Sequence, residues 1–148
     1  MSILYLNNKT LRGYISSRKV GGSFYPQSLQ NLLIRSFAED NKINLQLSGT
    51  EWNIKNSYLM LRSINNEFND GIIFFSLFQI LENDKNFINL SKKILTKKKI
   101  LVFCLENIIV TDFSEIKLIL KKLKINKFSN TESYHINSNT LKILKRLF

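Results

Sequence analysis

The segment 11–30 has the residue types of a binding site for a negatively charged or hydroxyl-rich ligand. Directly after an apolar run, it offers two hydroxyl groups, on Ser16 and Ser17, and the guanidinium group of Arg18. A guanidinium group recognises carboxylates and phosphates through paired hydrogen bonds. Pro26 suits the first turn of a helix, whose unpaired N–H groups favour anions. We therefore expect an anion-binding turn between a strand and a helix.

Further residues are expected to complete a site for a sugar ring. Gly22 gives the turn a backbone that can take positive φ, and Gln27 and Gln30 lie on the first turn of the helix that follows. Trp52 and Tyr58 offer aromatic faces, although most aromatic residues at these spacings pack in the core. Two polar residues near the end of another strand complete the predicted substrate-binding set: Ser76 and Gln79.

The candidate catalytic residues are Glu106, Ser17 and Glu51. Each glutamate follows a predicted strand, and two carboxylates in different surroundings can divide acid and base work. Alternatively, each carboxylate caps a loop or pairs with a lysine, and the serines satisfy the backbone of their turn. Ser17 has no evident base, because the only histidine, His135, lies in a polar tail and is expected to be exposed and inert.

No metal site and no cofactor are expected. Cys104 is the only cysteine, so no intramolecular disulfide can form, and neither it nor His135 has partners at the spacing of metal ligands. The chain contains no P-loop, and the pair Gly21-Gly22 is not a dinucleotide fingerprint.

Strands that alternate with helices position these residues. The predicted strands are 11–17, 43–48, 71–78 and 100–106, and the predicted helices are 26–41, 57–68, 87–95 and 113–124, with Ser57 capping the second helix and Thr111 or Asp112 the last. This alternation in 148 residues predicts a single α/β domain. We expect a three-layer sandwich around a mostly parallel four-stranded sheet of order 2-1-3-4. Ligands then bind at the carboxyl ends of the strands, between the first and third.

The core of this domain is expected to span about residues 11–124. Residues 125–148 form a tail, in which residues 140–148 are predicted to make a short amphipathic helix. That helix would dock on the body of the domain or on another subunit, so a homo-oligomer is a possible state of the protein.

The positive charge of the chain has two explanations. The net charge is +11, but the positive residues are 17 Lys and only 5 Arg in a chain rich in Ile and Asn. These residues have A/T-rich codons, so a low-GC genome accounts for part of the excess. The alternative is a nucleic-acid-binding face at 92–99 and 117–124. No apolar run is long enough to span a bilayer and the start does not look like a signal peptide, so we expect a cytoplasmic protein without a membrane partner.

Several motifs of the chain resemble the sporadic carbohydrate cluster protein family. They are R-G-Y-I-S-S-R at 12–18, G-G at 21–22, P-Q-x-x-Q-N-L at 26–32, Arg35, S-Y-x-M-L at 57–61 and L-E-N at 105–107. The resemblance covers about residues 11–110. It implies a role in bacterial gene clusters for surface polysaccharide or lipopolysaccharide (O-antigen) synthesis, and it carries over no reaction and no catalytic residue.

The order of elements also resembles the catalytic domain of serine recombinases, which begins with a similar G-Y strand. That family has an Asp-Arg-Leu motif after its third strand, where this chain has Leu77, Phe78, Gln79 and Ile80. Arg18 stands where that family's nucleophilic serine would fall. Strand transfer needs several guanidinium groups around a phosphodiester, so we expect the resolvase-like topology without the recombinase activity.

Taken together, the sequence favours an enzyme that binds and transforms a sugar or nucleotide-sugar intermediate, with transferase, isomerase and lyase reactions all open. The alternative is a non-catalytic partner or regulatory protein of the same pathway, built on a resolvase-like fold. A nucleic-acid-binding module is the least favoured hypothesis.

Overall fold

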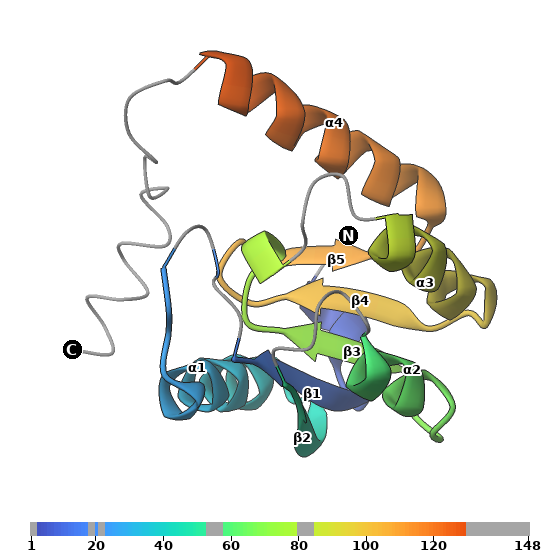
Figure 1. Cartoon of the computed structure of the whole chain (residues 1–148). Helices are drawn as coiled ribbons and strands as arrows, with labels where there is room; N and C mark the ends of the chain where they lie inside the picture. The colour runs from blue at the N-terminus through green and yellow to red at the C-terminus, as the bar shows by residue number, and fades with distance from the viewer. Residues whose placement is uncertain (1–2, 18–19, 21–22, 53–57, 80–84, 130–148) are drawn as a thin grey trace.

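Five strands form one sheet in the order β2-β1-β3-β4-β5 (Figure 1). The structure, a computed structural model, describes residues 3–17, 20, 23–52, 58–79 and 85–129. The strands are β1 (Thr10–Ser16), β2 (Asn44–Glu51), β3 (Gly71–Phe74), β4 (Ile100–Phe103) and β5 (Ile108–Val110). The first four are parallel and confirm the predicted α/β class and the order 2-1-3-4. β5 pairs antiparallel with β4.

Helices cover both faces of this sheet, as the alternation of strands and helices predicts. They are α1 (Gln27–Asp40), α2 (Leu59–Asn65), α3 (Lys85–Thr96) and α4 (Phe113–Ser129), with short 3-10 turns η1 (Ile3–Leu6) and η2 (Leu77–Gln79). α1 packs on one face, while α2, α3 and α4 pack on the other (Figure 1). This division follows from right-handed crossovers, because the path from β1 to β2 and the path from β2 to β4 run in opposite directions across the sheet.

Alternate side chains of the central strands build the two cores. In β3 and β4, Ile72, Phe74, Leu101 and Phe103 point to the face of α2, α3 and α4, where the rings of Phe74 and Phe103 stack with centroids 5.0 Å apart. Their neighbours Ile73, Ile100 and Val102 pack under α1. Both strands are therefore buried on both faces, which explains their nearly continuous apolar sequences.

The predicted sheet of four strands was incomplete, because Ile108–Val110 adds a fifth. A tight turn precedes this strand, with the Asn107 N–H donating to the Cys104 carbonyl and Asn107 itself at φ 54°. Asparagine tolerates this left-handed conformation better than most residues, so the chain can reverse within four residues. The prediction extended β4 through Glu106 and left too few residues for another strand before α4.

The strand predicted at 71–78 ends after Phe74, because side chains divert the backbone into η2. The Ser76 N–H donates to Oε1 of Gln79, and the Phe78 N–H donates to Oγ of Ser76. Side chains that bond nearby backbone groups compete in this way with sheet pairing. The hydrophobic pattern of the sequence does not indicate these hydrogen bonds between side chains and backbone.

The last helix is longer than predicted, since α4 continues to Ser129 instead of ending near residue 124. Its start agrees with the predicted Asp112 cap, since Oδ1 of Asp112 accepts the Phe113 N–H at 2.7 Å. Several other predictions lie outside the described residues, namely those for Arg18, Gly21, Gly22, Ser57, His135 and the helix at 140–148. Among the described helices, none has both the length and the apolar character to cross a membrane.

Two lysines of the positively charged stretch 92–99 stabilise the C-terminus of α2. Nζ of Lys99 donates to the carbonyl oxygens of Asn65 and Glu67 at 2.9 and 2.8 Å, and Nζ of Lys97 reaches the Asn65 carbonyl at 3.2 Å. Cations at a helix C-terminus satisfy its unpaired carbonyls and its partial negative charge. Part of the excess positive charge therefore belongs to the framework of the fold.

We expect Lys99→Met to lower the free energy of unfolding by about 2 kcal/mol, because a buried charged donor to two carbonyls is lost. Urea denaturation measures the change. Lys121→Met, which removes a charge from the exposed face of α4, serves as the control and should change stability by less than about 0.5 kcal/mol. Equal effects of the two substitutions would show that Lys99 does not stabilise the C-terminus of α2.

Candidate functional site

The strand order reverses between β1 and β3, and the ends of these two strands carry serines. Tyr14 of β1 pairs with Phe74 of β3, so Ser16 and Ser76 each follow two residues later at the carboxyl edge of the sheet. Doubly wound sheets bind their ligands at this reversal point, because the flanking crossovers leave to opposite faces there. The topology therefore brings together residues that the sequence keeps sixty positions apart.

Glu106 is the centre of a polar cluster at this edge. Its Oε1 accepts the Ser76 hydroxyl at 2.7 Å, and its Oε2 accepts the Leu77 N–H at 2.9 Å. Gln79 directs Oε1 toward the Ser76 N–H, and its Nε2 is buried without a hydrogen-bond partner within the described part of the chain. The Ser76, Gln79 and Glu106 side chains thus lie together at this edge, and one amide donor among them has no partner in the described ranges.

The surroundings of Glu106 favour its protonated form. Partial burial raises the pKa of this carboxyl above its ordinary value of 4.5, and the bonds from Ser76 and Leu77 oppose the shift. The buried Cys104 lies nearby, and its thiol pKa is raised well above the ordinary value, first by burial and then by the charge of Glu106. A carboxyl that titrates closer to neutral pH is suited to give and take protons.

We expect the raised pKa of Glu106 to make stability pH-dependent. The folded state holds this proton more tightly than the unfolded chain does. The contribution of the protonated Glu106 carboxyl to the free energy of unfolding is therefore complete below pH 4.5 and is lost as pH rises through the folded-state pKa. Urea denaturation of the wild type and of Glu106→Gln, from about pH 4 to about pH 7, measures the effect. As pH rises, the free energy of unfolding of the wild type should fall relative to that of Glu106→Gln. A constant difference would disprove the shift.

Both carboxylate oxygens of Glu51, the other candidate acid or base, accept hydrogen bonds from the protein itself. Its Oε2 accepts the Tyr14 hydroxyl at 3.1 Å and the Leu61 N–H at 3.2 Å, while its Oε1 accepts the Met60 N–H at 3.2 Å. The carboxylate is buried, and it caps the first turn of α2, whose N-cap residue Tyr58 makes no side-chain cap of its own. The structure therefore gives Glu51 a capping role.

The first strand ends in a similar internal network. Gln30 is fully buried: its Oε1 accepts the Ser16 N–H at 3.0 Å, and its Nε2 donates to the carbonyls of Ser16 and Tyr25. Ser17 ties β1 to β2, because both its N–H and its hydroxyl donate to the Glu51 carbonyl. We therefore assign Gln30 and Ser17 to the framework of the edge. Gln27 begins α1 and is partly exposed.

Three exposed aromatic side chains surround the carboxyl edge. Trp52 directly follows β2 and is 67% exposed, Phe24 precedes α1 and is 66% exposed, and Phe78 of η2 is 40% exposed. Trp52 and Tyr58 were both expected to offer aromatic faces, and Trp52 is the one of the two that is exposed. Phe24 was not predicted, although its place between the glycine-containing turn and Pro26 could have indicated it. Tyr58 is buried instead, with its ring edge-on to Phe87 at 5.7 Å.

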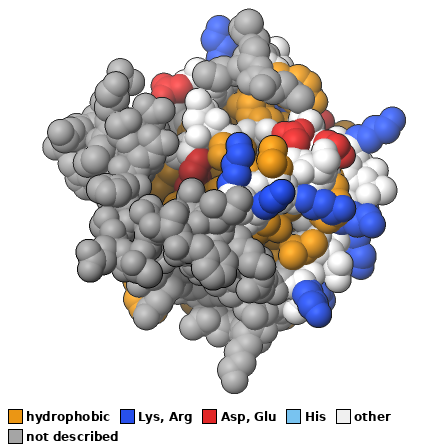
Figure 2. Space-filling model, turned by 90° about the horizontal axis from the view of Figure 1, so that it is seen from above, with side chains coloured by type: hydrophobic (Ala, Val, Ile, Leu, Met, Phe, Trp, Pro, Cys, Tyr) orange, Lys and Arg blue, Asp and Glu red, His pale blue; other side chains and the backbone are white. Residues whose placement is uncertain are grey.

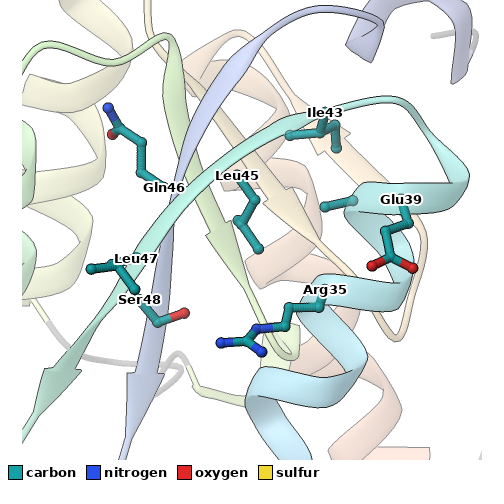
Figure 3. A pocket seen from close by; sticks show the side chains of 8 residues that line it. Arg35, Glu39, Ile43, Leu45, Gln46, Leu47 and Ser48 are labelled. Atoms are coloured by element: carbon teal, nitrogen blue, oxygen red, sulfur yellow. The ribbon is translucent and has the colours of Figure 1, made fainter.

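Two surface grooves of about 340 Å³ each lie away from this edge. One separates α1 from β2, and Figure 3 shows the Arg35 side chain reaching from α1 toward Ser48, beside Leu45. The other lies between α2 and α3 and is lined mainly by asparagines. Arg12 lies in neither groove and forms an ion pair, with Nε 3.4 Å from Oε2 of Glu67.

Positive charge gathers on the face formed by α3 and α4. Figure 2 looks onto this side of the molecule and shows Lys and Arg side chains over the right half of the view, next to hydrophobic ones. The exposed lysines of the two helices include Lys92, Lys93, Lys117, Lys121 and Lys122. Nζ of Lys92 and of Lys117 lie 5.7 and 5.1 Å from the centroid of the Phe113 ring, so this aromatic residue holds two of the charges together.

No three His, Cys, Asp or Glu side chains of the described ranges lie together as a metal site would require. A scan against protein-family models finds no match to the chain, and a search of curated proteins finds no related sequence.

Proposed function

We propose that the protein binds a sugar or nucleotide-sugar intermediate of bacterial surface-polysaccharide or lipopolysaccharide synthesis at the carboxyl edge of its sheet. The observation that carries the proposal is the cluster of Glu106, Ser76 and Gln79, which follows β3 and β4 next to the point where the strand order reverses. The motif resemblance to the sporadic carbohydrate cluster protein family supports the pathway, since it covers the segments that form this edge.

Each part of the edge suits one part of such a ligand. The unused Nε2 of Gln79 can donate to a ring oxygen or a hydroxyl group, and exposed aromatic faces such as that of Trp52 can stack on a sugar ring. Gln30 and Glu51 pair backbone groups near them within the framework. Such bonds order the described part of the edge, and an ordered site loses less entropy when a ligand binds.

We propose Glu106 as the acid or base that acts on this ligand. Glu51 and Glu106 both cap the turn of a neighbouring helix, but Glu51 is only 3% exposed, while Glu106 keeps part of its surface open to solvent. Its raised pKa gives the proton-transfer role a physical basis. Ser76 would act as a positioning residue, because its hydroxyl fixes the orientation of the Glu106 carboxyl.

A thermal-shift screen with UDP-, GDP- and dTDP-sugars tests the proposal. A ligand that binds only the folded state raises the melting temperature with concentration. We expect at least one nucleotide sugar to do so, and we expect Ser76→Ala and Glu106→Gln to reduce the shift. Glu39→Gln removes a carboxylate from the exposed part of α1 and should leave the shift unchanged. If no nucleotide sugar raises the melting temperature, the proposal fails.

A further inference from the structure

The groove between α2 and α3 has a polar lining where two packed helices would normally bury apolar side chains. α2 and its C-cap contribute Arg62, Asn65 and Asn66, and α3 contributes Asn86, Asn89, Leu90 and Lys93. Within each helix these residues are spaced three or four positions apart, so each set forms one stripe. Below the stripes, apolar residues of the same helices join the core, among them Leu61, Ile64 and Ile94.

The charges on the two walls of this groove have the same sign. Arg62 comes from α2 and Lys93 from α3, and none of the lining residues is an Asp or a Glu. Neither Arg62 nor Lys93 forms an ion pair within the described ranges of the chain. Two cations on opposite walls of a groove repel each other, and an anion between them removes that cost.

Two asparagines of the groove, Asn65 and Asn66, have amide groups that can bond a ligand. Asn65 is only 6% exposed, and its Oδ1 has no hydrogen-bond partner among the described residues. A buried acceptor without a partner is costly unless something supplies a donor. In Asn66, Oδ1 accepts a hydrogen bond from Nζ of Lys97 at 3.3 Å, which leaves its Nδ2 to donate. The groove therefore combines two cations, an unused acceptor and amide donors.

We propose that the groove between α2 and α3 is a second binding site, which takes a small phosphorylated sugar. Arg62 and Lys93 would hold the phosphate, because charge-assisted bonds to phosphate are stronger than neutral ones. The amides of Asn65 and Asn66 would bind the hydroxyl groups, with Oδ1 of Asn65 accepting from one of them. A volume of about 340 Å³ is at the lower end of the range of about 300–1,000 Å³ for small-molecule sites, so it suits a single sugar unit.

Two-dimensional NMR of the whole chain, titrated with glucose 1-phosphate, glucose and inorganic phosphate, tests this site. With glucose 1-phosphate, backbone amides in 62–66 and 86–93 should shift most. Inorganic phosphate should bind more weakly, and glucose should cause no shift at similar concentrations. Arg62→Gln and Lys93→Gln should each weaken glucose 1-phosphate binding about tenfold or more, while Arg62→Lys keeps most of it. The matched control Lys121→Gln, on α4, should leave the affinity unchanged.

Three results would overturn this proposal. The amides of the groove could fail to shift with glucose 1-phosphate at about 10 mM, binding could persist unchanged in Arg62→Gln, or inorganic phosphate could bind as tightly as the sugar phosphate. Glu106→Gln separates this site from the strand-edge site. It should weaken nucleotide-sugar binding at the edge and leave the glucose 1-phosphate shifts of the groove intact, so either site can fail without the other.

Discussion

Replacing Glu51 with leucine is expected to lower the free energy of unfolding by about 3 kcal/mol or more. The substitution leaves the N–H groups of Met60 and Leu61 and the hydroxyl of Tyr14 without their acceptor. Each buried donor without a partner costs about 1–3 kcal/mol. Domains of this size are stable by only about 5–15 kcal/mol, so one buried carboxylate supports a large part of the fold. Urea or thermal denaturation measures the loss.

Two further variants show whether the loss arises from the capping network. Tyr14→Phe removes only one of the three bonds to Glu51 and should cost about 1 kcal/mol. Glu39→Leu places the same substitution on an exposed part of α1 and should change stability by less than about 0.5 kcal/mol. If Glu51→Leu proves as mild as Glu39→Leu, the carboxylate does not hold α2 in place.

The second large effect is expected for Gln30→Leu, which should cost about 2–4 kcal/mol. The leucine has a similar volume, but the Ser16 N–H and the carbonyls of Ser16 and Tyr25 lose their partners beneath α1. Because these bonds join the end of β1 to the start of α1, the amides of Ser16 and Ser17 should also exchange faster with solvent. Hydrogen exchange and urea denaturation measure the two consequences.

A charge variant at the same position makes this test sharper. In Gln30→Glu, the carboxylate can still accept the Ser16 N–H but cannot donate to the two carbonyls, so the variant should regain stability as acid protonates it. Gln27→Leu, three residues earlier on the same helix and partly exposed, is the control. A Gln30→Leu protein as stable as Gln27→Leu would show that the tie between β1 and α1 is unimportant.

Most of the fold could be predicted because its strongest signals are local. The apolar runs that contain Ile72 and Val102 are buried on both faces, and the spacing of Leu33 and Phe37 marks the inner face of α1. Right-handed crossovers then fix the order of the strands. β5 was missed because its three residues depend on a reversal at Asn107, and their pairing with β4 leaves no periodic signal.

The sequence could predict which polar residues follow the strands, but not how each side chain is used. Of the residues placed at the strand ends, Ser16 and Ser17 lie at the end of β1 as expected, Ser76 contacts Glu106, and Arg18 lies outside the described residues. Whether a polar side chain faces a ligand or the chain itself depends on backbone groups far along the sequence. Gln30 reaches back to Ser16, and Glu51 reaches forward to Leu61. No local pattern reports such distant partners.

The asparagines of the groove between α2 and α3 show a related difficulty. Asn65 and Asn89 belong to helices that the sequence predicts, and their spacing within stripes is visible there. In a chain rich in asparagine, however, such stripes do not differ from a solvated surface until the two helices are packed side by side. The polar groove is a product of tertiary structure.

The central claim, that the carboxyl edge binds a nucleotide sugar, can be tested through Trp52. This residue is the only tryptophan of the chain and is 67% exposed beside the proposed site, so its fluorescence reports on the edge alone. We predict that a nucleotide sugar shifts the emission to the blue in a saturable way, and that Glu106→Gln weakens the apparent affinity about tenfold. Unchanged emission with every nucleotide sugar, or equal affinity in Glu106→Gln, would contradict the account.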